Sequence, residues 1–345
     1  MENYGLENLY IKNLNMSVDK KINVPDMERH LPVMIEIVPP ELGNEKKQLE
    51  IHKEYLERLQ KQVKIDIINL PEIQDEQKKG EGKRRSKFKE RVAPREYARL
   101  LSDYLDTEFV INRVIVKNEP EVQEDWLLET HNDYGIKKMI FVGGESPEIV
   151  YPGPTVVEGN QLAKKFLNEG NRKYREGTVQ PTEFSIGNIS IPHREVEGIR
   201  EAERMFRKIE SGADFFTTQI IAESETPGTL LKDLSQLLIN KGMQDQAPTI
   251  FWSFTPISSN KDVDFLRWLG VNIPEQTEEQ LLKTNNTAEA SVDLLEQVWE
   301  RILEIKQNLP VDIPMGVNVT AMGMRNFDHA ISLTEKLSSK QNASS

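Results

Sequence analysis

The chain has 345 residues and 37% hydrophobic content, so it can bury a large core, either as one large barrel or as two ordinary domains. A formal net charge of -12 argues against nucleic acid or an anionic membrane as the main partner, and the absence of cysteine excludes disulfides, thiolate metal sites and a cysteine nucleophile. No apolar run is long enough to span a bilayer and the amino terminus lacks the hydrophobic block of a secretory signal, so we expect a cytoplasmic protein, and we predict no metal site.

Short apolar runs alternate with amphipathic helical patterns along the chain. The first run is stopped by Pro39 and Pro40, and the second by Pro71. We predict strands over residues 33–38, 64–70, 109–116, 138–142, 183–188, 214–221, 249–254 and 316–320. We predict helices over residues 49–63, 121–132, 195–210, 229–240, 291–307 and 326–337, and extra helical turns within residues 270–290.

Eight strands that alternate with helical segments favour a closed parallel barrel over an open sheet, because each helix returns the chain right-handedly to the next parallel strand. The glycine-rich fingerprint of dinucleotide-binding open sheets is incomplete, since Gly143 and Gly144 lack a third glycine at the required spacing. The predicted fold is therefore a (β/α)8 TIM-type barrel over residues 31–340. We expect residues 1–30 to be an N-terminal extension and residues 341–345 to be a flexible tail.

A polar amide at the end of the sixth predicted strand marks a candidate ligand pocket. Gln219 follows an apolar strand, where an apolar residue would need no hydrogen-bond partners. Ligands bind at the carboxyl ends of the strands in barrels of this class. We therefore predict that Thr218 and Gln219 contact a ligand.

Glu36 is the strongest candidate for a catalytic residue. A carboxylate on the first strand is costly to bury, and its neighbours Ile35 and Ile37 would raise its pKa. Such a group could hold a proton near neutral pH and act as a general acid. The alternative is a strand-end glutamate in a structural ion pair.

The loop after the second predicted strand is strongly basic. Residues 78–91 contain eight basic and two acidic residues in a chain that is acidic elsewhere. Runs of like charge are usually solvated loops. The functional alternative is a lid or clamp for an anionic ligand, such as a nucleotide phosphate or a carboxylate tail.

The order of several short motifs resembles the methylenetetrahydrofolate reductase family. The motifs are residues 35–40 (Ile-Glu-Ile-Val-Pro-Pro), residues 143–145 (Gly-Gly-Glu), His193, residues 208–219 and residues 254–258 (Phe-Thr-Pro-Ile-Ser). The resemblance covers roughly residues 31–338. It implies an eight-stranded barrel that reduces 5,10-methylenetetrahydrofolate to 5-methyltetrahydrofolate, usually through FAD reduced by NADH or NADPH.

The resemblance also implies roles for individual residues. It assigns the general acid to Glu36, which would protonate the departing nitrogen as the five-membered ring of the folate opens. Gln219 matches a glutamine that hydrogen-bonds the pterin. Glu145 stands where the family has an aspartate that stabilises the cationic intermediate, although a turn carboxylate is the alternative. His193 matches a histidine near the flavin, although a structural loop residue would look the same.

Other positions depart from the family pattern. The predicted cofactor contacts are Asn69, Arg113, Gly143, Gly144 and His193. Gly143 and Gly144 replace the arginine-containing element after the fourth strand, Arg113 is the nearest match to a third-strand histidine, and Asn69 begins a segment that replaces a Thr-Tyr-Gly loop. NAD(P)H remains the expected reductant, and these departures leave FAD binding open.

Two functional interpretations therefore remain. The first is a reductase with NAD(P)H, with or without FAD. The second is a non-redox barrel that binds a pterin or a corrinoid-linked methyl carrier. The expected partners are a folate and a nicotinamide nucleotide, with no nucleic acid and no membrane, and a homo-oligomer is compatible with the sequence.

Overall fold

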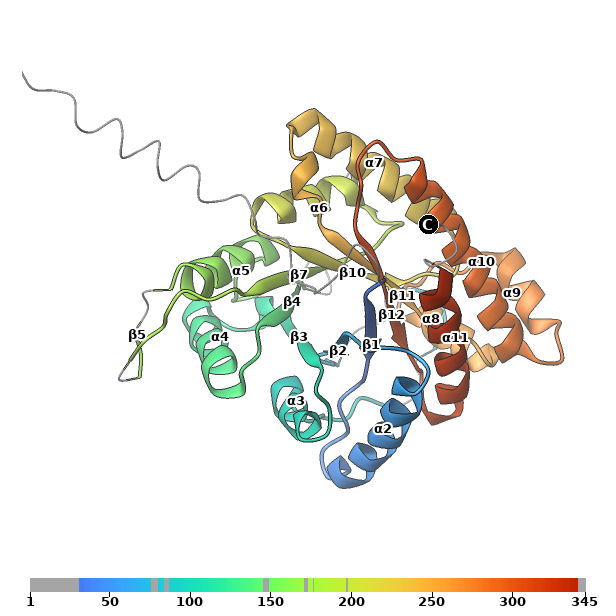
Figure 1. Ribbon diagram of the computed structural model, residues 1–345, viewed down its shortest axis with the longest axis horizontal. Coiled ribbons are helices and arrows are strands. Elements are labelled where there is room, and N and C mark those ends of the chain that lie inside the picture. Colours follow the sequence, from blue (N-terminus) through green and yellow to red (C-terminus); the bar gives the residue numbers. More distant parts are fainter. Residues whose placement is uncertain are drawn as a thin grey trace, which may run out of the picture.

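The computed structural model describes residues 31–75, 80–83, 87–144, 149–170, 173–175, 177–196 and 198–340. Eight parallel strands close into a barrel in the order β1-β12-β11-β10-β7-β4-β3-β2, and helices surround it (Figure 1). The predicted (β/α)8 barrel is confirmed. The predicted extension 1–30, the tail 341–345 and Glu145 lie outside the described residues. None of the described helices has the length and apolar character that a membrane span requires.

All eight barrel strands occur where the alternating pattern predicts them. They are β1 (Val33–Glu36), β2 (Ile67–Leu70), β3 (Glu108–Val114), β4 (Lys138–Val142), β7 (Ser185–Ser190), β10 (Phe215–Ile220), β11 (Thr249–Phe254) and β12 (Met315–Thr320). The helices are α2 (Glu45–Gln60), α3 (Pro94–Ser102), α4 (Pro120–Tyr134), α5 (Val156–Ala163), α6 (Glu201–Glu210), α7 (Glu225–Lys241), α8 (Asn260–Trp268), α9 (Glu275–Leu282), α10 (Thr287–Gln307) and α11 (Phe327–Ser339). Short hairpins pair β5 (Lys173–Tyr174) with β6 (Gly177–Thr178), and β8 (Glu195–Val196) with β9 (Ile199–Arg200).

The predicted helix over residues 195–210 is wrong in its first part. Glu195–Val196 (β8) and Ile199–Arg200 (β9) pair as antiparallel strands there, and α6 begins only at Glu201. Gly198, with φ of 73°, adopts the left-handed backbone that the tight turn requires. The buried Glu201 carboxylate accepts a hydrogen bond from Ile191 N at 3.0 Å and pairs with Arg194, which fixes the start of the helix.

An apolar layer fills the interior of the barrel. It comprises Met34, Ile67, Val110, Ile140, Phe215 and Phe251, one from each of six strands. The rings of Phe215 and Phe251 meet edge to face with centroids 6.1 Å apart. A Cβ atom at Gly187 would lie 2.4 Å from the ring of Phe215, and one at Gly316 would lie 2.7 Å from the ring of Phe251. Glycine on the neighbouring strands therefore makes room for the two phenylalanines, and together they close the barrel below the polar layer described next.

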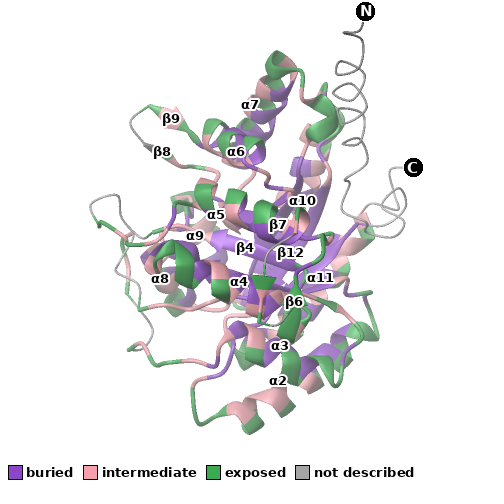
Figure 2. Cartoon of the chain, turned by 90° about the vertical axis from the view of Figure 1, so that its left-hand side faces the viewer, coloured by how far each residue is buried: buried purple, intermediate pink, exposed green. Residues whose placement is uncertain are grey.

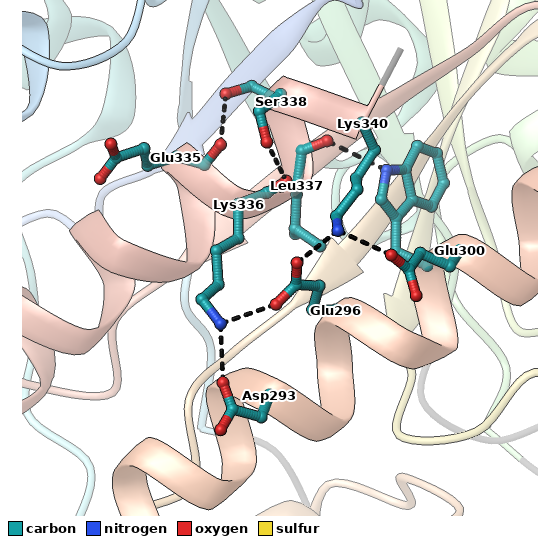
Figure 3. A network of polar contacts seen from close by, with 10 residues as sticks. Asp293, Glu296, Glu300, Glu335, Lys336, Leu337, Ser338 and Lys340 are labelled. Carbon is teal, nitrogen blue, oxygen red and sulfur yellow. Dashed lines mark hydrogen bonds and ion pairs between the residues drawn. The ribbon is translucent and has the colours of Figure 1, made fainter. Parts of the chain in front are cut away.

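The helices pack on the outside of the barrel through a second, larger core. Trp252 and Trp299 are fully buried in it, and the indole of Trp299 donates to Leu337 O at 3.1 Å. Ion pairs join α10 to α11 at the surface: Lys336 contacts Asp293 and Glu296, while Lys340 contacts Glu296 and Glu300 (Figure 3).

Helices α8 and α9 are an insertion between β11 and α10. They enclose a separate apolar cluster, with Val263 and Leu266 of α8 and Leu281 of α9 packed against Ala222 and Ile257 from the loops after β10 and β11. The loops that follow strands lie at the carboxyl end of a barrel. In the side view of Figure 2, α8, α9 and the β8–β9 hairpin lie toward the same side of the molecule. The insertion therefore builds up one side of the barrel mouth.

Candidate functional site

A polar layer lies directly above the apolar layer inside the barrel. Side chains two residues apart on a strand point to the same face, so the residues two positions beyond the apolar layer also face the interior. Most of them are polar: Glu36, Asn69, Asn112, Thr217, Ser253 and, two beyond Gly316, Asn318. The strand register joins several of them, since Glu36 is opposite Asn69 and Thr320, and Asn318 is opposite Ser253. The carboxyl end of the barrel therefore has a polar floor.

Glu36 is the one carboxylate among these residues. Asn69 Nδ2 donates to Glu36 Oε2 at 3.1 Å, and the side chains of Asn318 and Thr320 also hydrogen-bond the carboxyl group. Burial raises the pKa of Glu36, and the bonds from Asn318 and Thr320 offset part of that rise. The raised pKa favours a carboxyl group that keeps its proton above the usual range, which is the property expected of a general acid near neutral pH.

Five buried side-chain oxygens at this end have no hydrogen-bond partner within the described part of the chain. They are Asn69 Oδ1, Asn112 Oδ1, Thr217 Oγ1, Thr255 Oγ1 and Asn318 Oδ1. Each of these side chains is at most 8% exposed. Buried polar atoms are normally paired, because an unsatisfied one costs about 1–3 kcal/mol. Their concentration around Glu36 indicates a site for a polar ligand.

The amide groups of two asparagines are oriented by the protein itself. Asn69 donates to Glu36, and Asn318 Nδ2 donates to Ser253 Oγ at 3.0 Å. Since the donors are engaged, the oxygens of both amides remain as acceptors. With Asn112 Oδ1, the floor offers three amide acceptors to a ligand that carries N–H groups.

The two predicted ligand-binding residues of β10 lie near this floor but already have partners. Gln219 Nε2 donates to Leu269 O at 3.1 Å and Gln219 Oε1 accepts from Ile220 N at 3.1 Å, next to a register shift between Thr217 and Ile220. Thr218 Oγ1 accepts from Ser253 N at 2.9 Å and so stabilises the pairing of β10 with β11. The Gln219 side chain thus connects the end of β10 to the segment after α8.

Arg113, a predicted cofactor contact, lies on the outer face of β3. Its guanidinium group bonds Gln123 Oε1 and Glu72 Oε1, each at 3.0 Å, and stacks 4.3 Å from the ring of Trp126. Gln123 and Trp126 belong to α4, so Arg113 points away from the polar floor.

The remaining cofactor-contact candidates are also dispersed. Gly143 and Gly144 follow the end of β4. Gly144 lies against Tyr151, because a Cβ atom at Gly144 would be 2.2 Å from the nearest ring atom of Tyr151. His193 is exposed in the turn after β7. Asn69 alone of the five candidates contacts Glu36.

Sequence reasoning missed Asn112, Ser253, Asn318 and Thr320. The available signal was a polar residue at every second position of an apolar strand, as in residues 315–320 (Met-Gly-Val-Asn-Val-Thr). Alternation alone does not tell the barrel interior from the helix side, so these residues became candidates only once the strand register was known. No group of three or more His, Asp or Glu residues in the described ranges could hold a metal ion.

Comparison with known proteins identifies the fold. No protein-family model matches the chain, and no curated protein matches it. Among solved structures, a Clostridium thermocellum protein that binds two copies of 5-methyl-5,6,7,8-tetrahydrofolic acid matches with a TM-score of 0.69 at 21% identity, over 90% of this chain and 97% of that one. The Bacillus cereus spore cortex-lytic enzyme SleL matches with a TM-score of only 0.45 at 13% identity, over 89% of this chain and 75% of that one. At these identities the comparisons establish the barrel fold and nothing finer.

Proposed function

We propose that this protein binds a reduced folate at the carboxyl end of the barrel, with the pterin on the polar floor around Glu36. The observation that carries the proposal is the group of five buried oxygens without partners in the described chain, three of them amide acceptors. The pyrimidine ring of a pterin presents several N–H donors, which these acceptors match. The structurally similar Clostridium thermocellum protein binds 5-methyltetrahydrofolic acid, which supports a ligand of the same class.

The finer proposal is reduction of 5,10-methylenetetrahydrofolate to the 5-methyl form. The reaction needs one proton, to open the five-membered ring to an iminium ion, and one hydride, to reduce the methylene carbon. We propose that Glu36 gives the proton; burial raises its pKa, and hydrogen bonds from Asn69, Asn318 and Thr320 to its carboxyl group support this role. NAD(P)H would supply the hydride. The predicted roles of Gln219 in holding the pterin, and of Glu145 in stabilising the cation, belong to this proposal.

A flavin is not needed for this chemistry, and the positions predicted to contact one do not converge. Arg113 is bonded to Glu72 and Gln123 on the outer face of β3, and His193 is exposed after β7. We therefore propose direct hydride transfer from the nicotinamide nucleotide to the folate.

A non-redox folate-binding barrel is the second candidate. It is favoured by the chemical form of the ligand in the similar structure, because 5-methyltetrahydrofolic acid is both a product of reduction and a methyl donor. Such a protein would need the polar floor but would not need a proton at Glu36.

Two measurements on the purified protein test the proposal. Calorimetric titration with 5-methyltetrahydrofolate tests binding, and oxidation of NADH or NADPH in the presence of 5,10-methylenetetrahydrofolate tests reduction. Binding together with folate-dependent oxidation supports the reductase. Binding without oxidation supports the non-redox candidate, and failure to bind removes both. The absorbance spectrum of the same sample tests the flavin, since bound FAD would contradict direct transfer.

A further inference from the structure

Two apolar side chains interrupt the polar floor. Of the eight strand positions that lie two residues beyond the apolar layer, six carry the polar residues described above, and the other two carry Val142 on β4 and Ile189 on β7. Both side chains pack against the apolar layer, which places them inside the barrel. We call these two residues the apolar pair. Recognition of a pterin through its N–H groups does not require them, so they have another role at the barrel mouth.

The two side chains of the apolar pair are neighbours. In the register of β4 with β7, Phe141 is opposite Asn188, so the next residue of each strand brings Val142 beside Ile189. Neighbouring strands lie about 4.8 Å apart, which puts paired side chains on one face within contact distance. Both residues are β-branched, so their χ1 angles are restricted. The pair therefore presents one fixed apolar surface.

The apolar pair lies across the barrel from Glu36. In the closed sheet, β12, β11 and β10 separate β1 from β7 in one direction, and β2, β3 and β4 separate them in the other. Figure 1 shows β4 and β7 on the side of the barrel away from β1 and β12. Ile189 is therefore opposite Glu36, and by the same count Val142 is opposite Asn318.

Glu36 and the apolar pair are the accessible part of this layer. Glu36, Val142 and Ile189 are partly exposed, whereas the amide and hydroxyl side chains of the layer are at most 8% exposed. A ligand that enters the mouth therefore meets a carboxyl group on one side and two apolar side chains on the other. Covering apolar surface contributes about 25 cal/mol per Å². The pair thus suits an uncharged planar ring, which has apolar faces.

The proposed reaction needs a proton and a hydride from two different directions. Glu36 must reach the departing nitrogen, which carries the aminobenzoyl group, so this group belongs on the side of Glu36. The opposite side then remains for the hydride donor. The dihydronicotinamide ring is uncharged and can rest on apolar side chains. Loss of the hydride makes the ring a cation, and loss of the proton makes Glu36 a carboxylate, so the two opposite charges arise across the same floor.

We propose that the apolar pair seats the nicotinamide ring of the hydride donor, across the bound folate from Glu36. The proposal deepens the proposed function and rests on it for the identity of the hydride donor. The aminobenzoyl ring of the folate is the other source of an uncharged planar ring, and the test separates the two. The anionic clamp predicted at residues 78–91 stays a prediction, because residues 78, 79 and 84–86 lie outside the described residues.

The test compares Val142→Thr/Ile189→Thr with the unaltered protein. Threonine keeps the β-branched shape and adds a hydroxyl group that a bound ring would leave without a hydrogen-bond partner. Calorimetry measures the dissociation constants of NADH and NADPH and of the matching ADP-ribose compounds, which lack the nicotinamide, with and without saturating 5-methyltetrahydrofolate. We expect the variant to bind the preferred dinucleotide about tenfold more weakly and its ADP-ribose compound as before.

A second pair of ligands tests the aminobenzoyl alternative. 5-Methyltetrahydrofolate is compared with a 5-methyltetrahydropterin that lacks the aminobenzoyl and glutamate groups. If the double variant loses affinity for the folate but not for the pterin or the dinucleotide, the apolar pair holds the aminobenzoyl ring and the proposal is wrong. The control Val122→Thr makes the same substitution at an exposed position of α4 and should bind every ligand normally.

The single variants Val142→Thr and Ile189→Thr are measured alongside the double variant, and urea denaturation establishes that each protein unfolds cooperatively. Each single variant should weaken the binding of the dinucleotide in the same direction and by less than the double variant. A folding defect in the double variant therefore leaves the singles to decide.

Failure of the folate proposal is recognised separately. If the unaltered protein binds NADH or NADPH but no folate, the proposed function is wrong, and a selective loss of the dinucleotide in the variants still supports the seat. If the unaltered protein binds neither dinucleotide, the seat proposal is overturned, whether or not a folate binds. Equal loss of the dinucleotide and its ADP-ribose compound, or unchanged affinity in the variants, would also overturn it.

Discussion

Asn69 Nδ2 donates to Glu36 Oε2 over 3.1 Å, across the pairing of β2 with β1. The bond leaves Asn69 Oδ1 buried and without a partner in the described chain. One asparagine thus orients the carboxyl group and also presents an acceptor to a ligand. The proposed proton transfer and the proposed ligand binding therefore share the same polar floor.

Glu36→Gln tests proton transfer. The amide keeps the shape of the side chain and loses the proton, so we expect folate-dependent NAD(P)H oxidation to fall by about 100-fold or more, while the dissociation constant of 5-methyltetrahydrofolate changes little. Steady-state kinetics and calorimetry on the same preparation measure both. If activity falls by less than about tenfold, which corresponds to roughly 1.4 kcal/mol of activation free energy, Glu36 is not the acid.

The same variant should change the pH dependence of stability. Because the folded-state pKa of Glu36 is raised, its contribution to stability is fully present below the unfolded pKa of about 4.5 and is lost as pH rises through the folded value. Glu36→Gln cannot ionise, so its stability relative to the unaltered protein should increase from pH 5 to pH 8. Urea denaturation across this range measures the difference, and a constant difference would mean that Glu36 is not perturbed by burial.

The buried His52 should make the folded protein less stable in acid. The ring is buried, its Nδ1 lies 2.7 Å from Tyr97 Oη, and burial lowers its pKa to about 4. Since the folded pKa lies below the usual 6.5, stability is present above pH 6.5 and is lost as pH falls toward 4, by up to about 3 kcal/mol. His52→Gln should be less stable at pH 7.5 but should lose less stability on acidification, and parallel pH profiles would contradict this.

Asn318 and Gln219 give contrasting predictions. Asn318→Ala removes a buried acceptor and a bond to Glu36, so we expect about tenfold weaker folate binding. Gln219→Ala also removes the bond to Leu269 O, so weaker folate binding should be accompanied by loosening of the α8–α9 insertion, measured by hydrogen exchange. Normal affinity in Gln219→Ala would exclude it from the site. Normal affinity in Asn318→Ala would mean that its amide oxygen does not meet the ligand.

The sequence predicted the barrel better than it predicted the site. Residues 249–254 form β11 as predicted, because a short apolar run bounded by polar turn residues is typical of a buried strand. Two short helices, α3 and α5, were missed despite local signals, namely Pro94 at the start of α3 and the capping box of Thr155 with Glu158 at the start of α5.

Individual site residues depended on information that local patterns lack. Glu36 could be singled out because a carboxylate between Ile35 and Ile37 is unusual by itself. Asn318 and Ser253 could not, since only the pairing of β11 with β12 brings them together and toward Glu36. Arg113 resembled a site residue. It directly follows the inward-facing Asn112 on β3, so its side chain points outward to α4, where it contacts Gln123 and Trp126.

Binding of 5-methyltetrahydrofolate tests the central claim most directly. In a calorimetric titration, the unaltered protein should bind the ligand with a dissociation constant of about micromolar order, and Asn69→Ala/Asn318→Ala should bind it at least about tenfold more weakly while unfolding cooperatively. Absence of binding by the unaltered protein at millimolar ligand, or equal binding by both proteins, would contradict a folate site on the polar floor of the barrel.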